Sequence, residues 1–282
     1  MKTKDELIEQ LLDLAFAEDI GDGDHTTLST IPADAMGRSK LLIKEEGILS
    51  GVEEAVKTLK KLDPEVEVEV FIRDGARVKP GDIAFIASGP VRSLLTAERT
   101  LLNIMQRMSG VATMTRRYQD ELEGLHTKVL DTRKTTPGMR MLEKKGVKDG
   151  GGENHRIGLF DMILIKDNHI DFAGGIDKAV ARAEEYCREK GKNLKIEVEA
   201  RSLEDVKKLV EMPAVSRIMF DNFTPELTRE AVKLVAGRKE TESSGGITLQ
   251  NLREYGETGV DFISVGALTH SVKGLDMSFK AC

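Results

Sequence analysis

Basic residues gather in one stretch of the chain. Residues 131–170 contain eight Lys or Arg and six Asp or Glu, so they carry a net charge of +2 in a protein whose formal net charge is −6. The stretch includes Arg133, Lys134, His155, Arg156 and Lys166. Guanidinium and ammonium groups bind carboxylates and phosphates well, and Arg can bind a carboxylate through two parallel hydrogen bonds. The stretch therefore predicts a site for small anions.

Acidic and glycine-rich positions further along the chain complete this pattern. Glu199 and Asp221 each stand in or just after a short apolar run. Carboxylate oxygens are ligands that Mg²⁺ prefers, so we expect this pair to bind Mg²⁺, in part through water. The segments Ser244-Gly245-Gly246 and Gly266-Ala267 offer backbone N–H groups that can approach a phosphate closely. Together these groups suit a site for phosphorylated substrates.

The elements that must position these groups form a repeating pattern after Gly124. Short runs that resemble strands alternate with helix-like segments, which is typical of a parallel sheet wrapped by helices. The predicted strands are 128–130, 162–165, 196–198, 218–220, 241–244 and 262–265, and the predicted helices are 138–148, 175–190, 202–212, 225–236 and 248–258. In a parallel α/β barrel all the strand carboxyl ends lie on one face, where active sites are built. Six such units favour a barrel or near-barrel, and a doubly wound sheet is the alternative.

The first part of the chain has a different character. Residues 65–70 alternate charged and apolar side chains, which predicts a strand with one solvent-facing side. A long helix is predicted over residues 92–122, with an interruption near Ser109-Gly110. Near the amino terminus, Leu7, Leu11 and Leu14 lie at helical spacing. We therefore predict a small amino-terminal α+β domain over residues 1–115, whose last helix bridges onward, and a catalytic domain over 116–282.

Each of these features, taken singly, has a simpler interpretation. An Arg-Lys pair after a strand is commonly an exposed corner, and a Ser-Gly-Gly segment is commonly a turn. Glu197 and Glu199 could point outward from an amphipathic strand, and Gly150–152 could form a flexible loop. What favours a functional site is that charged or glycine-rich residues follow six consecutive predicted strands.

The composition excludes several classes of protein. Aromatic residues make up 4% of the chain and Trp is absent, which disfavours stacking on nucleic-acid bases. Apolar runs fall short of the roughly 20 residues needed to cross a bilayer, and acidic residues near the amino terminus do not fit a signal peptide. Cys187 and Cys282 are far apart and outside any CxxC pattern, so neither a disulfide framework nor a zinc site is indicated. We expect a cytoplasmic enzyme without nucleic-acid or membrane partners.

A resemblance to a known family sharpens these expectations. Residues 131–169 read DTRKTTPGMRMLEKKGVKDGGGENHRIGLFDMILIKDNH, and this stretch resembles the signature region of the quinolinate phosphoribosyltransferases almost residue for residue. Further similar segments are EDIGDGDHTT at 18–27, ERTLLNIMQRMSG at 98–110, EVE at 197–199, FDNF at 220–223, ESSGGI at 242–247 and DFISVGALTHS at 261–271. The resemblance covers nearly the whole chain in the family's order. Lys145-Gly146 departs from it, because the family more often has an aromatic and a small residue there.

The resemblance implies a fold and a set of site residues. The fold is that of the type II phosphoribosyltransferases, with an amino-terminal α/β sandwich domain and a carboxyl-terminal, incomplete α/β barrel of about seven strands. The implied quinolinate-binding residues are Arg99, Arg133, His155, Arg156 and Lys166, with Thr132 also at the substrate. The residues implied around phosphoribosyl pyrophosphate and Mg²⁺ are Lys134, Glu199, Asp221, Ser244, Gly245, Gly246, Gly266 and Ala267. Lys134, Glu199 and Asp221 would be catalytic, and Arg99 would come from a partner subunit in a homodimer or a dimer-based oligomer.

The implied activity is the formation of nicotinate mononucleotide, pyrophosphate and CO₂ from quinolinate and phosphoribosyl pyrophosphate, in de novo NAD biosynthesis. One alternative is a homologous phosphoribosyltransferase-like protein, of the kind encoded with molybdate transporters, that acts on another acceptor. A second is a non-catalytic protein that binds anions or nucleotides. A third is a barrel aldolase with Lys166 as a Schiff base.

Overall fold

The computed structural model describes residues 2–282, and the chain folds into two compact units. The first unit comprises the chain up to Arg116 together with Thr135–Gly151 and Leu268–Cys282. The second unit comprises Arg117–Lys134 and Gly152–Ala267. The chain therefore enters the second unit twice, and each unit is assembled from segments that are far apart in sequence.

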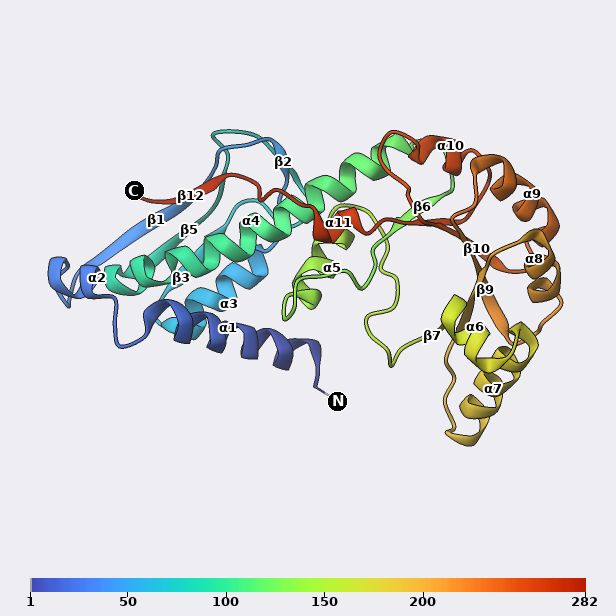
Figure 1. Ribbon diagram of the computed structural model, residues 1–282. Helices are drawn as coiled ribbons and strands as arrows, with labels where there is room; N and C mark the ends of the chain where they lie inside the picture. Colours follow the sequence, from blue (N-terminus) through green and yellow to red (C-terminus); the bar gives the residue numbers. More distant parts are fainter. Residues whose placement is uncertain (1) are drawn as a thin grey trace. The chain divides into compact units, whose positions relative to one another are not determined.

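Within residues 2–282, the first unit is built on an antiparallel sheet of four strands (Figure 1). In hydrogen-bonded order the strands are β12 (Met277–Ala281), β1 (Met36–Ile43), β5 (Ile83–Pro90) and β3 (Glu67–Val70). The last strand of the chain thus pairs with the first, which ties the carboxyl end into this unit. A separate ladder joins β2 (Gly47–Ile48) to β4 (Arg77–Val78).

Apolar faces of two helices pack on this sheet. The helices of the unit are α1 (Lys4–Ile20), α2 (His25–Thr30), α3 (Val52–Leu62), α4 (Val91–Glu121), α5 (Arg140–Asp149) and α11 (Ala267–His270), of which α4 ends and α11 begins in the second unit. Leu59 of α3 and Leu101 of α4 belong to the same buried cluster as Leu41 of β1 and Phe85 of β5. Burial of this cluster is the main source of the stability of the unit.

The amino-terminal helix α1 begins as its sequence directs. The Thr3 side chain accepts a hydrogen bond from the Glu6 backbone N–H, and the Glu6 carboxylate accepts one from the Thr3 backbone N–H. This reciprocal pair satisfies two N–H groups that a helix start leaves without partners. Ile8 and Leu12 are the buried side chains of the helix, whereas Leu14 is 63% exposed. The predicted helix is confirmed, with its buried face turned slightly from the predicted one.

Helix α4 is a single helix of 31 residues, so the interruption expected near Ser109-Gly110 is wrong. A Cβ added at Gly110 would lie 2.3 Å from the carbonyl oxygen of Lys273, so the glycine permits close packing against another segment. The Ser109 hydroxyl donates to the Ser50 carbonyl at 3.0 Å and accepts from the Ser50 N–H at 2.9 Å. Both residues thus serve contacts between elements.

The second unit contains a parallel sheet of six strands within the described residues (Figure 1). In hydrogen-bonded order the strands are β6 (Lys128–Leu130), β11 (Phe262–Ser264), β10 (Glu240–Ser244), β9 (Val215–Asp221), β8 (Ile196–Ala200) and β7 (Ile163–Ile165). All neighbouring pairs are parallel. Within residues 2–282 the two edge strands β6 and β7 do not pair, so the barrel is incomplete, with six strands where about seven were expected.

Helices follow most strands of this sheet, and the sequence predicts all of them except the short helix at 167–173. They are α6 (Asp167–Ala173), α7 (Ile176–Glu189), α8 (Leu203–Val210), α9 (Pro225–Val235) and α10 (Leu252–Gly256). Helix α10 is shorter than the predicted 248–258, because Thr248 and Asn251 form a turn in which the Asn251 side chain accepts from the Thr248 N–H at 2.7 Å. Throughout the described chain, no helix has both the length and the apolar character needed to span a membrane.

Candidate active site

A cavity of about 350 Å³ lies at the carboxyl ends of the strands of the second unit. Its lining residues are Thr132, Arg133, Lys134, His155, Arg156, Leu164, Lys166, Met219, Glu242, Ser244 and Ser264. Seven of these are predicted site residues, and they come from segments more than 100 positions apart in the chain. Because parallel strands end at the same edge of a sheet, the fold brings these side chains to one place.

The buried carboxylate of Asp131 holds one wall of the cavity. Asp131 directly follows β6, and its Oδ1 accepts the backbone N–H of His155 at 2.9 Å. The segment around Glu153 runs parallel to β6, with the Glu153 N–H donating to the Val129 carbonyl at 2.9 Å. Asp131 therefore positions His155 and Arg156 at the end of a strand to which they are not adjacent in sequence.

Cationic groups dominate the lining of the cavity. Arg156 is 9% exposed, and burial together with the positive charge of Arg133 lowers the pKa of its guanidinium from the ordinary value. Nearby carboxylates oppose part of this shift. Keeping two guanidinium groups close together costs free energy, which an anion bound between them would offset. This arrangement fits a carboxylate or phosphate ligand.

Two of the predicted site carboxylates, those of Glu199 and Asp221, lie close enough to interact electrostatically. Glu199 is 4% exposed, forms an ion pair with the ammonium group of Lys166, and accepts the backbone N–H of Asp167 at 3.0 Å. Burial raises the pKa of Asp221, and the negative charge of Glu199 raises it further. A divalent cation would relieve the repulsion between Glu199 and Asp221. The donor set of these two side chains thus fits Mg²⁺, held by hard oxygen ligands.

The turn after β10 adopts a backbone conformation that favours glycine. Gly245 has φ +99°, and a Cβ there would lie 2.1 Å from the side-chain oxygen of Asn222. Gly246 has φ +62°, and a Cβ there would meet open space. Two consecutive glycines with positive φ form this turn, and turns of this kind can present backbone N–H groups to a phosphate.

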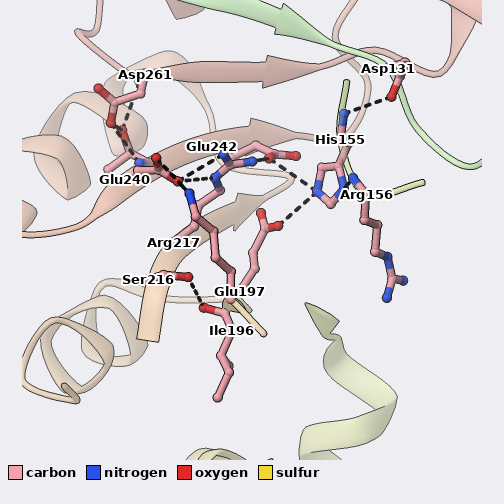
Figure 2. A network of polar contacts seen from close by, with 12 residues as sticks. Asp131, His155, Arg156, Ile196, Glu197, Ser216, Arg217, Glu240, Glu242 and Asp261 are labelled. Carbon is pink, nitrogen blue, oxygen red and sulfur yellow. Dashed lines mark hydrogen bonds and ion pairs between the residues drawn. The ribbon is translucent and has the colours of Figure 1, made fainter. Parts of the chain in front are cut away.

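A buried network of charged side chains adjoins the cavity (Figure 2). The His155 Nε2 lies 2.9 Å from Glu197 Oε2 and 3.5 Å from Glu242 Oε2. The Arg217 guanidinium donates to Glu242 Oε2 at 3.0 Å and to Glu240 Oε2 at 3.0 Å. Its carbon atom lies 4.2 Å above the ring centre of Phe262. Opposite charges compensate one another in this network, which is how buried charges persist in proteins.

Sequence reasoning missed Asp131, Arg217 and Glu242 as parts of the site. The available signal was the sequence ETESS of β10, whose middle three residues are buried although all five are polar. A buried polar strand must contain side chains that find partners inside the protein. The alternative in which Glu197 and Glu199 point outward is wrong, since β8 is buried along its whole length and both carboxylates meet partners in the unit.

His155, Glu197 and Glu242 also place ligand atoms within 4.8 Å of one another, as a metal site would. The guanidinium of Arg217 already contacts Glu242, however, and its positive charge would repel a second cation. Burial, which removes hydration, and the carboxylate of Glu197 raise the pKa of Glu242 to about 8, although His155 and Arg217 oppose the shift. The group is better described as a network of buried charges around Arg217 than as a metal centre.

The other predicted site residues lie outside the lining of the cavity. Glu199 and Asp221 lie near it and interact with its lysine, Lys166. Gly266 lies between β11 and α11 and Ala267 is the first residue of α11, so both follow the strand as predicted. Arg99 is an exposed residue of α4 in the first unit, whereas the residues that line the cavity belong to the second unit.

Comparison with known proteins identifies the family. Residues 24–109 match the family model "Quinolinate phosphoribosyl transferase, N-terminal domain", and residues 111–280 match "Quinolinate phosphoribosyl transferase, C-terminal domain". The chain belongs to the quinolinate phosphoribosyltransferase family. The two matched ranges together cover most of the chain, in the order in which the resemblance was found.

Curated relatives and solved structures of this family cover the chain nearly end to end. The chloroplastic nicotinate-nucleotide pyrophosphorylase (carboxylating) of Oryza sativa subsp. japonica is 44% identical over 288 residues, which cover 97% of this chain and 77% of the rice protein. The crystal structure of NadC from Streptococcus pyogenes has a TM-score of 0.92 and 37% identity, covering 99% of this chain and 98% of that one. The nicotinate-nucleotide pyrophosphorylase from Francisella tularensis has a TM-score of 0.90 and 37% identity, covering 100% of this chain and 98% of that one. The quinolinate phosphoribosyltransferase fold expected from the sequence is thereby confirmed.

Proposed function

We propose that this chain catalyses the transfer of a phosphoribosyl group from phosphoribosyl pyrophosphate to quinolinate, with release of pyrophosphate and CO₂, to form nicotinate mononucleotide in de novo NAD biosynthesis. The observation that carries the proposal is the cavity of about 350 Å³ that brings Arg133, Arg156 and Lys166 together at the strand ends. Membership of the family supports the same reaction.

The charges of the substrates explain why such a cavity is needed. Quinolinate is a dianion and phosphoribosyl pyrophosphate carries more negative charge still. Two such anions repel each other strongly where the effective dielectric constant is low. Arg133, Arg156 and Lys166 would bind the two carboxylates of quinolinate, and the turn at Gly245-Gly246 would bind phosphate through backbone N–H groups.

The residues of the chain stabilise the charges that develop during transfer. As the bond between the ribose and pyrophosphate breaks, the ribose becomes oxocarbenium-like, and Glu199 or Asp221 would stabilise that positive charge. Lys134 would stabilise the negative charge on the departing pyrophosphate. The ring nitrogen of quinolinate forms the new bond to the ribose. The ring nitrogen is then cationic, and its positive charge stabilises the electron pair that stays on the adjacent ring carbon as CO₂ departs. That carbon then takes up a proton.

Mg²⁺ would be held by Glu199 and Asp221, in part through water, and would supply positive charge that offsets the charge of the pyrophosphate group. Burial raises the pKa of Asp221 and repulsion from Glu199 raises it further; a bound cation would remove this repulsion, which supports the assignment.

We further propose that two copies of the chain share their sites, with the partner subunit's Arg99 binding the acceptor. Arg99 is exposed on α4, so its guanidinium is available to another chain. The Schiff-base alternative is not favoured, because the ammonium group of Lys166 is held in an ion pair with Glu199 whereas a Schiff base requires a neutral amine.

The test is direct. The purified protein is incubated with quinolinate, phosphoribosyl pyrophosphate and Mg²⁺, and the products are separated and trapped. Nicotinate mononucleotide and CO₂ in equal amounts are expected, with little product when Mg²⁺ is chelated. Binding of the substrates without any product would mean that the protein is an anion-binding protein instead.

A further inference from the structure

One acidic side chain lines a cavity that is otherwise suited to anions. Glu242 is 0% exposed and faces the same cavity as Arg133, Arg156 and Lys166. An ionised carboxylate in this position would repel a dicarboxylate at short range and low dielectric. The presence of Glu242 there needs a physical explanation.

Two buried carboxylates flank the imidazole of His155. The His155 Nδ1 accepts the backbone N–H of Arg156 at 2.7 Å, so in the neutral ring the proton is on Nε2. The Nε2 atom lies 2.9 Å from Glu197, closer than the 3.5 Å to Glu242. Both carboxylates are thus within ion-pair distance of the same ring nitrogen, and of the two only Glu242 lines the cavity. A dianion bound in the cavity raises the proton affinity of Glu242 more than that of Glu197, so Glu242 is the carboxyl group that takes up the proton.

Charged and polar side chains from three other strands surround Glu242. Arg217 of β9 contacts it at 3.0 Å, but the same guanidinium also binds Glu240 of β10. The carboxylate of Glu197 approaches from β8, and Ser264 of β11 bonds to Glu242. The three carboxylates thus face one guanidinium and the imidazole of His155. One added proton reduces this excess of negative charge, which burial makes costly.

We propose that Glu242 is a neutral carboxylic acid when the dianionic acceptor occupies the cavity, so that acceptor binding is coupled to proton uptake at this side chain. As an acid, Glu242 no longer repels the acceptor and can donate a hydrogen bond, as buried neutral carboxyl groups do in other enzymes. This inference rests on the proposed function, because it takes a pyridine dicarboxylate as the acceptor.

The direction of the pH dependence follows from the surroundings. Burial and Glu197 raise the pKa of Glu242 to about 8, so in the free protein the side chain loses its proton as the pH rises through that value. A bound dianion raises the pKa further. Binding at pH 8 should therefore take up as much as about half a proton per site, and more at higher pH. Affinity for the acceptor should fall by up to about tenfold per pH unit above that range.

Isothermal titration of the full-length protein with quinolinate, between pH 7 and pH 9.5, measures this coupling. At each pH the heat is recorded in buffers of different ionisation enthalpy, and the dependence of heat on that enthalpy gives the number of protons taken up. Glu242→Gln keeps the shape of the side chain and removes its titration. Glu240→Gln is the matched control, because Glu240 lies on the same strand and binds the same arginine but does not line the cavity.

The proposal expects uptake in the wild type and in Glu240→Gln, and none in Glu242→Gln. Wild-type binding of quinolinate without proton uptake across this range would overturn the inference and leave the proposed function intact. Uptake that persists in Glu242→Gln would assign the proton to another group, such as His155, and would also overturn it. Failure of the wild type to bind quinolinate at any pH would instead overturn the proposed function, and the inference with it.

Discussion

The guanidinium of Arg217 donates a buried hydrogen bond from Nη1 to Oε2 of Glu242 at 3.0 Å, beside the cavity. Arg217 stands on β9 and Glu242 on β10, so this pair couples two neighbouring strands of the sheet. It also compensates only part of the negative charge that Glu197, Glu240 and Glu242 bring together. Because the charge of Glu242 changes with pH, the stability of the second unit should also change with pH.

The first prediction concerns this link. Glu242 has a folded-state pKa of about 8, above the ordinary value of 4.5 expected in the unfolded chain. Between those values the folded state binds more protons than the unfolded state, so the free energy of unfolding falls as the pH rises from 4.5 to about 8. Gln cannot titrate, so Glu242→Gln should gain stability relative to the wild type between pH 5.5 and pH 8.5, as measured by thermal unfolding. A difference in Tm that stays constant over that range would contradict this prediction.

The second prediction concerns the acceptor. Nicotinate lacks one carboxylate of quinolinate and would leave cationic groups of the cavity without a partner. Each charge-assisted hydrogen bond contributes about 1.5–3 kcal/mol, so kcat/KM should be lower for nicotinate by at least about 10- to 100-fold. Steady-state kinetics with each acid checks this. Comparable values for the two acids would show that Arg133, Arg156 and Lys166 do not bind the acceptor's carboxylates.

The third prediction separates the two substrate subsites. Glu199→Ala and Asp221→Ala should each lower kcat by about 100-fold or more and weaken the response to Mg²⁺, because both carboxylates would stabilise charge in the transition state. Binding of quinolinate should stay largely intact. Asp171→Ala, which removes an exposed carboxylate paired with Arg201, is the control for a general effect of charge. If calorimetry shows that either site variant abolishes quinolinate binding, the carboxylates belong to the acceptor subsite.

The fourth prediction concerns sharing of sites between subunits. Arg99→Ala and Lys166→Ala should each be nearly inactive. In a mixed dimer, one site would carry both substitutions and the other would carry neither, so about a quarter of all sites in a random mixture should be intact. Co-expression with two different tags allows the mixed dimer to be purified and assayed. If it has no more activity than the parent variants, Arg99 does not act in the partner's site.

The fifth prediction concerns Lys145, where the sequence departs from the family. Its ammonium group forms ion pairs with Asp74 and with Asp149, the latter at 2.9 Å, and its side chain is 14% exposed. Glu54, at 3.8 Å, has a pKa raised by burial. Lys145→Met would leave these carboxylates without a counter-charge, and about 3–5 kcal/mol of stability should be lost.

Lys57→Met is the matched control for that experiment. Lys57 pairs with Asp5 at 3.1 Å in the same unit, but both side chains are largely exposed. Exposed ion pairs contribute about 0–1 kcal/mol, so this substitution should change the free energy of unfolding little. Urea denaturation of both variants gives the comparison. Equal losses would mean that burial of the Lys145 cluster has no special cost.

The alternation of short apolar runs with helix-like segments was sufficient to predict all six strands of the parallel sheet, although it missed helix α6. Each of the six predicted runs is a strand, because buried parallel strands and their covering helices leave local patterns in the sequence. The same patterns put Arg133 and Lys166 at strand ends, where the cavity is found. The expected break at Ser109-Gly110 was wrong because a glycine chosen for close packing looks, in sequence, like one that ends a helix.

The sequence alone determined the kinds of residues at each strand end, and hence the anion-binding character of the site, because strand ends are local features. Only the tertiary structure decided which of them meet. Arg217 lies opposite Glu240 because β9 and β10 pair in one register, and a shift of one residue would turn every side chain to the other face. Asp131 reaches His155 because a distant segment runs beside β6. Such contacts depend on pairing between segments far apart in the chain, which local periodicity does not encode, and so the network around Glu242 became visible only in the folded protein.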